Sequence, residues 1–446
     1  MMASIYNWVK KNKVASVFLF VFFLQRIILL IQLGPEYNLN SDDIGYINSG
    51  IHFWQTGEII MHGVRSAQIM PGMPVLIGLF SAIFGTGFYL YLSLKITWMF
   101  MGLAAILFVY KTACIHLPKW AANIAVFFFV TPDFAWMDQT VLTETPFQLC
   151  FVLMIYSTVQ MAKTHRKKYF WICLIFYFFG LMLKANIGIY PLFAAVYLLL
   201  MKYNWKLLIK QGLILGAVVL CFVIPWSIRN YCVFHDFIPL TYGAGNPVLL
   251  GTYQGWGYPS DAELDYQKNV DEIMKEKYAW YYKNGKDQEP HIKKYLSLQK
   301  DVVKAQYRLR EWWEKNPESF LSSFFVVKPK SMVYSTFYWK EVFDFPAESI
   351  LVYRHIDFTL CIISVFLSLI IRKMRRFVLF LGGTYAVNIL LYSMTFSFSR
   401  YAQTLLFLRY IMAAVAVFLL WRLLKGLYCS FKETALYSFM FVDSKK

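Results

Sequence analysis

Charged residues are scarce in this sequence. Only 16% of its 446 residues are Asp, Glu, Lys or Arg, whereas soluble domains carry about 25%. Hydrophobic residues make up 58% of the chain and aromatic residues 19%. A soluble fold cannot keep so much apolar surface away from water. The composition therefore excludes a disordered scaffold, a disulfide-stapled secreted module and a coiled coil, and it predicts an all-α polytopic membrane protein.

Cysteine frameworks and nucleotide-binding motifs are also missing. The seven Cys residues are scattered, mostly inside apolar runs, so we interpret them as small buried apolar side chains. The sequence contains no Walker loop, no dinucleotide fingerprint and no zinc-ligand spacing. A net charge of +18 would suggest nucleic acid as the partner of a soluble protein. Membrane topology explains that charge better here, and we expect no nucleic-acid partner.

Long apolar runs are abundant. A helix needs about twenty apolar residues to cross the hydrocarbon core of a membrane. The runs that are long enough cover roughly 14–34, 94–112, 119–136, 146–162, 168–184, 187–201, 209–227, 350–371, 377–396 and 404–422. A further run, 73–92, is interrupted by Gly78, Gly85 and Gly87.

The basic residues predict the topology, because Lys and Arg accumulate in cytoplasmic loops. They form clusters at 10–13, 111–119, 163–168, 202–210, 372–376 and in the tail from 422 to 446. All of these clusters can be cytoplasmic only if the number of crossings is even. We therefore expect about ten crossings, with 73–92 a shallow or re-entrant element on the outer side. The first run lacks a small-residue cleavage site, so we expect a membrane span there and not a signal peptide.

This topology divides the chain into three parts. Residues 1–227 form a membrane core that includes a first outer loop, 35–72, and the element 73–92. Residues 228–349 are polar, carry charges of both signs and have a helical pattern from about 262 to 326, so we expect an outer cap. Residues 350–446 add membrane helices and a cytoplasmic tail. The lack of an internal repeat disfavours a transporter built from inverted repeats.

Acidic residues stand at the outer ends of two predicted spans. Asp42 and Asp43 follow the first span, where a carboxylate beside apolar surface suits a general base or a metal ligand. Together with Ser41 they are equally typical of helix capping. Glu144 has either a functional role or a structural one at a helix start, because Thr143 or Glu144 next to Pro146 can satisfy the free amides there.

Three cations also lie at outer ends of spans, against the charge bias: Lys184, Arg229 and Arg400. Cations at membrane depth are costly and tend to be functional, and an anionic phosphate or lipid headgroup would explain them. Snorkelling to the interface is the alternative. Arg229 has a rigid fork suited to phosphate, with Asn230 beside it. Arg26 lies within the first span and either pairs with a carboxylate or lines the same cavity.

Several motifs occur in an order that resembles a known family. They are Asp42-Asp43-x-x-Tyr46, Pro71-Gly72-Met73-Pro74 with Phe84-Gly85, Thr143-Glu144, Gly180-x-x-x-Lys184, Pro225-Trp226-x-x-Arg229-Asn230-Tyr231 with Phe237-Ile238-Pro239-Leu240 and Asn246…Gly251, Asn316-Pro317…Lys328, and Arg400-Tyr401. The series resembles the GT-C glycosyltransferases, in particular the bacterial protein O-mannosyltransferase and lipid A aminoarabinose transferase group (glycosyltransferase family 39 and relatives). It covers residues 1 to about 420.

The resemblance implies a GT-C fold with about ten transmembrane helices, outer juxtamembrane helices and a small, mainly helical cap. It also implies inverting transfer of a sugar from a polyprenyl-phosphate donor to an acceptor hydroxyl at the outer face of a bacterial plasma membrane. The implied catalytic residues are Asp42 and Asp43, with Asp42 as the base. The implied phosphate-binding residues are Arg229, Lys184 and Arg400, and those that contact substrate are Glu144, Tyr46, Asn230 and Tyr401.

The resemblance does not specify whether the reaction needs a divalent metal. It also does not specify whether the acceptor is a protein, a lipid or a cell-wall glycan. Two other functions remain open at this point. A flippase or transporter of lipid-linked sugars would move the lipid without cleaving a glycosidic bond. A glycan polymerase would use a diphosphate donor, and its product would grow in repeats.

Overall fold

The computed structural model describes residues 2–261 and 266–442, and it describes side chains for 6–261 and 266–426. The end of the predicted basic tail, 443–446, lies outside the described residues. Within them the fold is helical, apart from a hairpin of two-residue strands, β1 (Ile60–Met61) and β2 (Val64–Arg65). The expected all-α architecture is thus confirmed.

The N-terminal half consists of a helical bundle. Its elements are α1 (Met2–Lys11), α2 (Lys13–Leu33), α3 (Asp42–Thr56), α4 (Gly72–Phe84), α5 (Phe88–Ala113), α6 (Lys119–Phe127), η1 (Phe128–Val130), α7 (Asp133–Met137), α8 (Glu144–Thr164), α9 (Lys167–Leu183), η2 (Ala185–Ile189), α10 (Tyr190–Leu200) and α11 (Trp205–Phe234).

The C-terminal half contains a group of polar helices and then three long apolar ones. Its elements are α12 (Gly245–Gly251), α13 (Gln267–Lys277), α14 (Ala279–Lys283), η3 (Lys286–Gln288), α15 (Pro290–Lys315), α16 (Pro317–Ser322), the π-helix η4 (Ser323–Val327), α17 (Lys328–Val333), α18 (Ala347–Ile370), α19 (Arg372–Ser393), α20 (Ser399–Gln403) and α21 (Leu406–Val442).

Seven helices in the described part of the chain are long and apolar enough to cross a membrane. They are α2, α5, α8, α11, α18, α19 and the first part of α21, Leu406–Gly426. The chain is thus a multi-pass membrane protein. The other three expected crossings, 119–136, 168–184 and 187–201, form the shorter helices α6 with η1, α9, and α10 with η2. The first of these ends because Thr131 precedes Pro132 and takes an extended conformation, with ψ 138°.

The sequence suggested a single shallow or re-entrant element over residues 73–92. The structure instead divides this run between two helices, α4 and α5. Gly85 and Gly87 have φ angles of 72° and 76°, a region that favours glycine, and they separate α4 from α5. Helix α5 consequently begins at Phe88, six residues before the expected start. At about 1.5 Å per residue, α4 is about 20 Å long.

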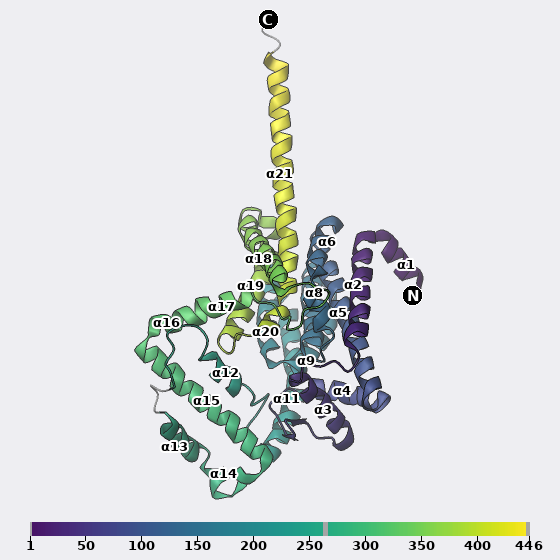
Figure 1. Ribbon diagram of the computed structural model, residues 1–446. Coiled ribbons are helices and arrows are strands. Elements are labelled where there is room, and N and C mark those ends of the chain that lie inside the picture. Colours follow the sequence, from purple (N-terminus) through teal and green to yellow (C-terminus); the bar gives the residue numbers. More distant parts are fainter. Residues whose placement is uncertain (1, 262–265, 443–446) are drawn as a thin grey trace.

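Helices α2 and α5 run in opposite directions. The hydroxyl of Tyr110, near the end of α5, donates to Oδ1 of Asn12, just before α2 (3.0 Å). The end of α5 therefore lies beside the start of α2, and the segment 34–87 between them begins and ends at the opposite end of the bundle. Helices α3 and α4 both lie at this opposite end (Figure 1).

Basic clusters gather at the end of the bundle where α2 begins. Lys119 Nζ donates to the carbonyl of Lys11 (2.8 Å), and Lys163 Nζ donates to that of Ile115 (2.7 Å). The cluster 372–376 lines a cavity together with His116, which follows Ile115, and Met201, which precedes the basic cluster 202–210. The polar segments 35–72 and 228–349 lie toward the other end (Figure 1).

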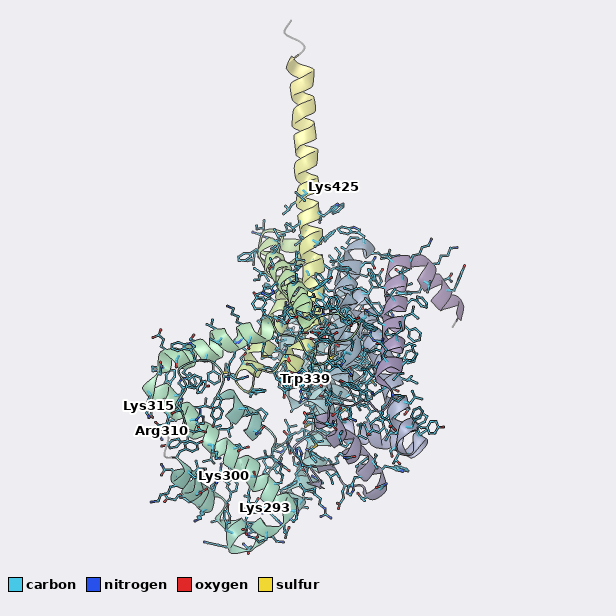
Figure 2. The ribbon with its side chains drawn as sticks, in the orientation of Figure 1. Lys293, Lys300, Arg310, Lys315, Trp339 and Lys425 are labelled. Atoms are coloured by element: carbon cyan, nitrogen blue, oxygen red, sulfur yellow. The ribbon has the colours of Figure 1, made fainter. Side chains whose placement is uncertain are left out.

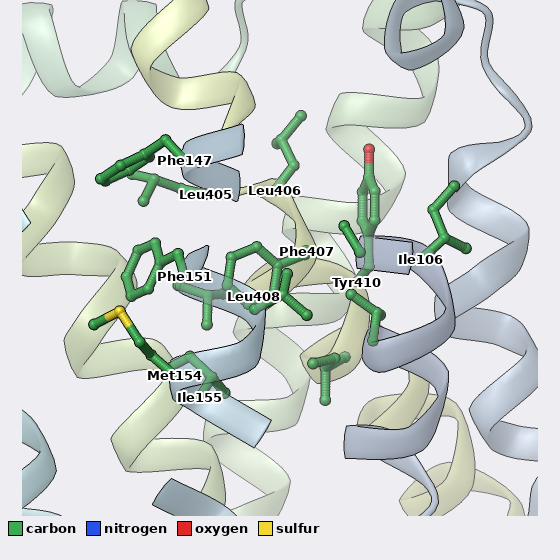
Figure 3. Packing of buried hydrophobic residues seen from close by; sticks show 14 of the residues in the cluster. Ile106, Phe147, Phe151, Met154, Ile155, Leu405, Leu406, Phe407, Leu408 and Tyr410 are labelled. Carbon is green, nitrogen blue, oxygen red and sulfur yellow. The ribbon is translucent and has the colours of Figure 1, made fainter. Parts of the chain in front are cut away.

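Helix α8 lies at the centre of the bundle's core, because 83% of its most apolar 18-residue segment is buried. Figure 3 shows Phe147 and Phe151 of α8 beside the first turn of α21. The rings of Phe151 and Phe407 pack edge to face, with centroids 5.5 Å apart. This contact attaches the C-terminal helices to the centre of the N-terminal half.

Helices α12 to α17 form an arc beside the lower part of the bundle (Figure 1), and we call this group of helices the cap. The helical pattern predicted over 262–326 corresponds to α13–α16 and η4. Tyr281 donates a hydrogen bond to the carbonyl of Phe234 (2.5 Å), which joins the cap to the end of α11. Figure 2 shows the long side chains of Lys293, Lys300 and Arg310 along α15.

Candidate functional site

Four of the predicted site residues meet in one chain of alternating charges. Arg400 Nη2 lies 2.6 Å from Asp42 Oδ2, and Arg400 Nε lies 3.5 Å from Glu144 Oε1. Lys184 Nζ lies 2.8 Å from the same Glu144 oxygen. We call Asp42, Glu144, Lys184 and Arg400 the cavity cluster. Its members come from positions as far apart in sequence as 42 and 400.

Helix ends bring the cavity cluster together. Asp42 and Glu144 are the first residues of α3 and α8, where the partial positive charge of a helix start stabilises a carboxylate. Lys184 directly follows α9, and Arg400 lies in the short helix α20. All four positions belong to the end of the bundle opposite the basic clusters, because the antiparallel helices α8 and α9 meet there.

The two cations face a cavity of about 500 Å³. Lys184, Arg400, Tyr46 and Tyr401 line it. The Glu144 side chain behind them is only 1% exposed, whereas the Asp42 side chain is 34% exposed. The cavity therefore presents two positive groups and leaves one carboxylate within reach of a ligand.

Two aromatic side chains form another wall of this cavity. The rings of Tyr392 and Tyr401 stack with centroids 5.0 Å apart, and Asn186 Nδ2 donates to the Tyr392 hydroxyl (2.6 Å). The Lys184 ammonium lies 5.0 Å from the centre of the Tyr401 ring. Sequence reasoning missed Tyr392 and Asn186. Tyr392 lies in an apolar run without any distinguishing mark, and the position of Asn186 two residues after Lys184 was the one available signal.

The electrostatics keep Arg400 charged and Tyr46 neutral. Burial alone would lower the pKa of Arg400, but the charges of Glu144 and Asp42 raise it overall. Burial raises the pKa of Tyr46, and the neighbouring Asp42 carboxylate raises it further. Tyr46 is consequently a hydrogen-bond donor at any physiological pH.

The cap covers the cavity through close backbone contacts. A Cβ atom on Gly243 would lie 2.3 Å from the carbonyl oxygen of Gln68, and one on Gly251 would lie 2.3 Å from that of Thr395. Only glycine permits this approach. Behind Gly251, Lys328 Nζ donates to the same Thr395 oxygen (3.0 Å), and burial lowers the pKa of Lys328 to about 7.

Asp43 does not share the position of Asp42. Its carboxylate accepts hydrogen bonds from the backbone amides of Leu39 (2.6 Å), Ser41 (3.1 Å) and Ile44 (3.0 Å), and the residue is 1% exposed. These contacts shape the turn before α3. The structure therefore gives Asp43 a structural role in this turn and places only Asp42 in the cavity cluster.

The structure also places Arg229 and Asn230 outside the cavity cluster. Arg229 Nη1 donates to the carbonyl of Ser66 (3.0 Å) and to Asn230 Oδ1 (2.9 Å). Asn230 Nδ2 donates to the carbonyl of Ile238 (2.8 Å). Both residues fasten the end of α11 to neighbouring loops, so the expected roles in phosphate and substrate binding do not fit their contacts.

Arg26 pairs with a carboxylate, which was the first of the two interpretations of its position in the first span. Its Nε donates to Asp138 Oδ2 (2.7 Å), and both side chains are 1% exposed. Thr145 donates to the other Asp138 oxygen (2.7 Å). This buried ion pair lies within the bundle and holds the turn before α8 against α2.

The donor set does not match a divalent-metal site. Among the described residues, no group of three or more His, Cys, Asp and Glu side chains is arranged to hold a metal ion. The two carboxylates of the cavity cluster are each paired with a cation. We therefore derive no step through a metal.

An apolar cavity of about 300 Å³ lies next to the polar one, between α4, α5, α8 and α9. Leu79, Met101 and Phe179 are among its lining residues. Leu183 lines both cavities, and Lys184 follows it directly. A long apolar group that fills the apolar cavity would thus end beside Lys184 and Arg400 of the polar cavity.

Comparisons with known proteins place part of the chain in a known family. Residues 69–228 match a family model described as dolichyl-phosphate-mannose-protein mannosyltransferase. The matched segment contains Glu144 and Lys184, whereas Asp42 and Arg400 lie outside it. The match confirms the recognised resemblance to this family of glycosyltransferases over residues 69–228. No curated protein matches the sequence.

Solved structures of membrane proteins resemble the fold of this chain. The archaeal oligosaccharyltransferase AglB from Archaeoglobus fulgidus, in complex with an inhibitory peptide and a dolichol-phosphate, is similar with a TM-score of 0.53 and 14% identity. That match covers 96% of this chain but 52% of AglB, so the chain spans about half the length of that protein. ArnT from Cupriavidus metallidurans, bound to undecaprenyl phosphate, has a TM-score of 0.41 and 13% identity, with 93% of this chain and 78% of that chain covered.

Proposed function

We propose that the chain transfers a sugar from a polyprenyl-phosphate donor to an acceptor hydroxyl, with inversion, on the outer side of a bacterial plasma membrane. The observation that carries this proposal is the pair of adjoining cavities. The polar one presents Lys184 and Arg400, and the apolar one meets it at Leu183. This arrangement fits an amphiphile with a phosphate between a sugar and a long apolar tail.

In this proposal, Lys184 and Arg400 bind the donor phosphate. Negative charge on the leaving phosphate grows as the glycosidic bond breaks, so the two cations bind the transition state more tightly than the donor. The guanidinium of Arg400 can contact two phosphate oxygens at once. Glu144 holds both cations in place from behind the cavity wall, and Tyr401 and Tyr46 contact the substrate.

Asp42 is the proposed general base. The acceptor oxygen attacks the anomeric carbon from the face opposite the phosphate, and the hydroxyl proton passes to Asp42 as the carbon–phosphate-oxygen bond breaks. Arg400 Nη2 lies 2.6 Å from Asp42 Oδ2, so this ion pair occupies one oxygen of the carboxylate. A bound phosphate competes for Arg400, so we expect the donor to bind before Asp42 accepts a proton.

The proposed orientation rests on the basic clusters. They gather at one end of the bundle, and the positive-inside rule assigns that end to the cytoplasm. The cavity cluster lies at the opposite end, which is then extracytoplasmic. This assignment requires an even number of passes, so in this proposal the shorter helices α6, α9 and α10 cross together with the seven long ones.

The test is the release of polyprenyl phosphate by the purified protein. Polyprenyl-phosphate hexoses and pentoses are supplied as donors and a membrane extract of the host as acceptor. Wild type should release the lipid phosphate and label an acceptor. The rate of Asp42→Asn should be lower by roughly 10²–10⁴-fold, which is the usual contribution of a general base. Asp344→Asn is the matched control, because Asp344 is exposed and Asn tolerates its left-handed backbone equally well.

The same assay separates the alternatives. Donors that remain intact while lipid moves across the membrane would contradict the proposal in favour of a flippase. Consumption of diphosphate donors alone, with a product that grows in repeats, would do so in favour of a polymerase. An Asp42→Asn variant as active as wild type would leave a transferase with a different base.

A further inference from the structure

A third cavity, of about 360 Å³, lies on another face of α3. Asn40, Ser41, Gly45 and Asn48 line one side of it, and His62 in the β1–β2 turn lies on the other. Aliphatic atoms of Ile44, Ile60 and Met61 complete its surface. The lining contains amide, hydroxyl and imidazole groups but no Asp, Glu, Lys or Arg.

Helix α3 separates this cavity from the one that faces the cations. Tyr46 lines the cation-facing cavity, and it is one turn from Asp42 on the same helix. Ser41, Gly45 and Asn48 follow a second stripe of α3 at helical spacing and line the third cavity. Asp42 is the first residue of the helix, and at helical spacing it falls between Tyr46 on one stripe and Gly45 on the other. Its half-buried carboxylate contacts Arg400, which lines the cation-facing cavity.

The charges on either side are consistent with that position. Asp42 contacts Arg400, which lines the cation-facing cavity. His62, which lines the third cavity, is also within the field of Asp42: burial and Lys294 lower the pKa of His62, and the Asp42 carboxylate opposes them. The lowered pKa keeps His62 neutral near pH 7, so the third cavity remains uncharged.

We propose that the third cavity binds the acceptor, and that the acceptor group it takes is an uncharged carbohydrate. This inference rests on the proposed function. Inversion requires the attacking hydroxyl and the leaving phosphate to approach the anomeric carbon from opposite sides, and the two cavities lie on different faces of the helix that bears the base.

The residues that line the third cavity determine which chemical class of acceptor it can bind. Without Lys or Arg, the cavity has no partner for a phosphate or carboxylate, and any anionic group of the acceptor must lie elsewhere. The amides of Asn40 and Asn48 each offer both a donor and an acceptor, which suits neighbouring hydroxyl groups of a sugar. In the reaction, one of those hydroxyls gives its proton to Asp42 and its oxygen forms the new bond to the anomeric carbon.

The test uses methyl hexopyranosides as acceptor probes, with the donor that wild type accepts. Asn48 is exposed on α3, so Asn48→Trp should fill the cavity without disturbing the core. Gln55→Trp places the same ring on the same helix outside the cavity, at another exposed position. A third variant, Asn48→Leu, keeps the approximate shape and removes the amide.

The expected result is a change in acceptor use alone. Asn48→Trp should abolish transfer to the hexosides, and Asn48→Leu should raise the acceptor KM about tenfold, the effect of losing one or two hydrogen bonds. The donor KM and the slow release of lipid phosphate to water should stay at wild-type values in both, and Gln55→Trp should match wild type throughout.

An unchanged acceptor KM in Asn48→Trp would overturn the assignment of the cavity. Transfer to Ser/Thr peptides but not to hexosides would overturn the assignment of a carbohydrate. Failure of wild type to release lipid phosphate from any donor would instead contradict the proposed function itself, so the two failures are distinguishable.

Discussion

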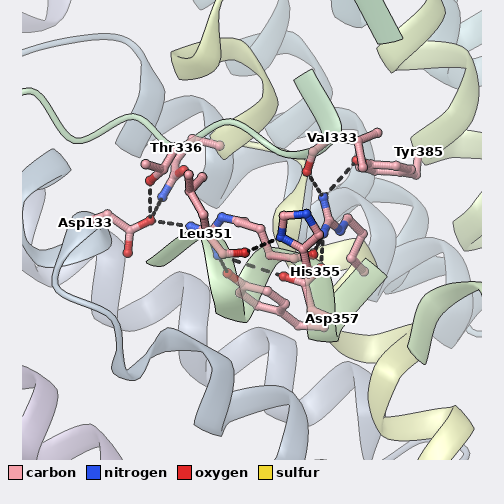
Figure 4. A network of polar contacts seen from close by, with 11 residues as sticks. Asp133, Val333, Thr336, Leu351, His355, Asp357 and Tyr385 are labelled. Atoms are coloured by element: carbon pink, nitrogen blue, oxygen red, sulfur yellow. Dashed lines mark hydrogen bonds and ion pairs between the residues drawn. The ribbon is translucent and has the colours of Figure 1, made fainter. Parts of the chain in front are cut away.

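Two regions of the molecule contain two carboxylates and two cations each, in very different surroundings. One is the cavity cluster. The other is a network between α7, α18 and α21, which we call the sealed network: Asp133, Arg354, Asp357 and Arg409. Arg354 contacts Asp133, and Arg409 donates to the carbonyl of Val333 (2.7 Å) and to the Tyr385 hydroxyl (3.2 Å). Figure 4 labels Asp133, Asp357, Val333 and Tyr385 within this network.

The two regions differ in access. All four side chains of the sealed network have 0% exposure. In the cavity cluster, Asp42 is 34% exposed, and both cations are 12% exposed and line a cavity. The same charge composition thus supports two roles. Sealed charges join helices, whereas charges that face a cavity remain able to exchange their protein partners for a ligand.

The largest expected effect concerns the sealed network. Arg354→Leu leaves the Asp133 carboxylate buried with only Gln403 (2.6 Å) and Thr336 (3.4 Å) as partners. Removal of one partner of a buried ion pair costs about 3–5 kcal/mol of folding stability. We expect a marked fall in the thermal unfolding midpoint in detergent. Arg310→Leu is the control, because Arg310 is 77% exposed and surface pairs contribute at most about 1 kcal/mol. Equal midpoints would contradict the distinction between the two regions.

The next effect concerns the cavity cluster. Arg400→Lys keeps the charge but removes the fork that faces the phosphate, so transfer should fall by roughly 10²-fold, as for other lost transition-state contacts. Arg229→Lys should leave the rate per folded molecule near wild type, because Arg229 binds the carbonyl of Ser66 and not the cavity. Initial rates at saturating donor measure both. The reverse order of effects would return Arg229 to the site.

A smaller effect is expected in the apolar cavity. Leu79→Trp should obstruct the lipid tail and raise the donor KM about tenfold, or about 1.4 kcal/mol in binding. The turnover number should not change, since the tail is far from the bond that breaks. Ile83→Trp, on an exposed position of the same helix that does not line the cavity, should behave as wild type. Equal donor KM values for the two variants would exclude this route for the tail.

The smallest expected effect concerns Lys328. Its pKa is about 7 in the folded protein, below the ordinary value of 10.5, so the unfolded chain binds more protons between these values. Folding stability should therefore rise with pH in wild type from pH 7 to 9, relative to Lys328→Met. Lys330→Met, at an exposed neighbouring position, should keep the wild-type slope. Parallel midpoint curves for Lys328→Met and wild type would show that Lys328 is charged when buried.

Helix type and the cavity cluster were accessible from the sequence for different reasons. Apolar runs mark helices directly, and the ordered motifs singled out Asp42, Glu144, Lys184 and Arg400. Arg229 shared the same motif signal, but its partner is a backbone carbonyl 163 positions away, which no local pattern reveals. The break at Gly85 and Gly87 was visible in the sequence, yet its effect depends on the backbone angles there.

The sealed network escaped sequence reasoning although its residues were accessible to it. Arg354, Asp357 and Arg409 lie inside predicted spans, where a charge is costly and deserves a named partner. Asp133 closes the network from a short helix, α7, that follows Pro132. Which of these charges are sealed and which face a cavity depends on tertiary packing, and only exposure in the folded chain separates the two regions.

The measurement that tests the central claim most directly is an experimental structure of the wild-type protein with polyprenyl phosphate bound. Our account predicts the phosphate within hydrogen-bonding distance of Lys184 and Arg400, the tail in the cavity beside Leu79 and Phe179, and Asp42 released from Arg400. A phosphate bound at Arg229, or a phosphate at the cavity cluster with the Asp42–Arg400 contact intact, would contradict it.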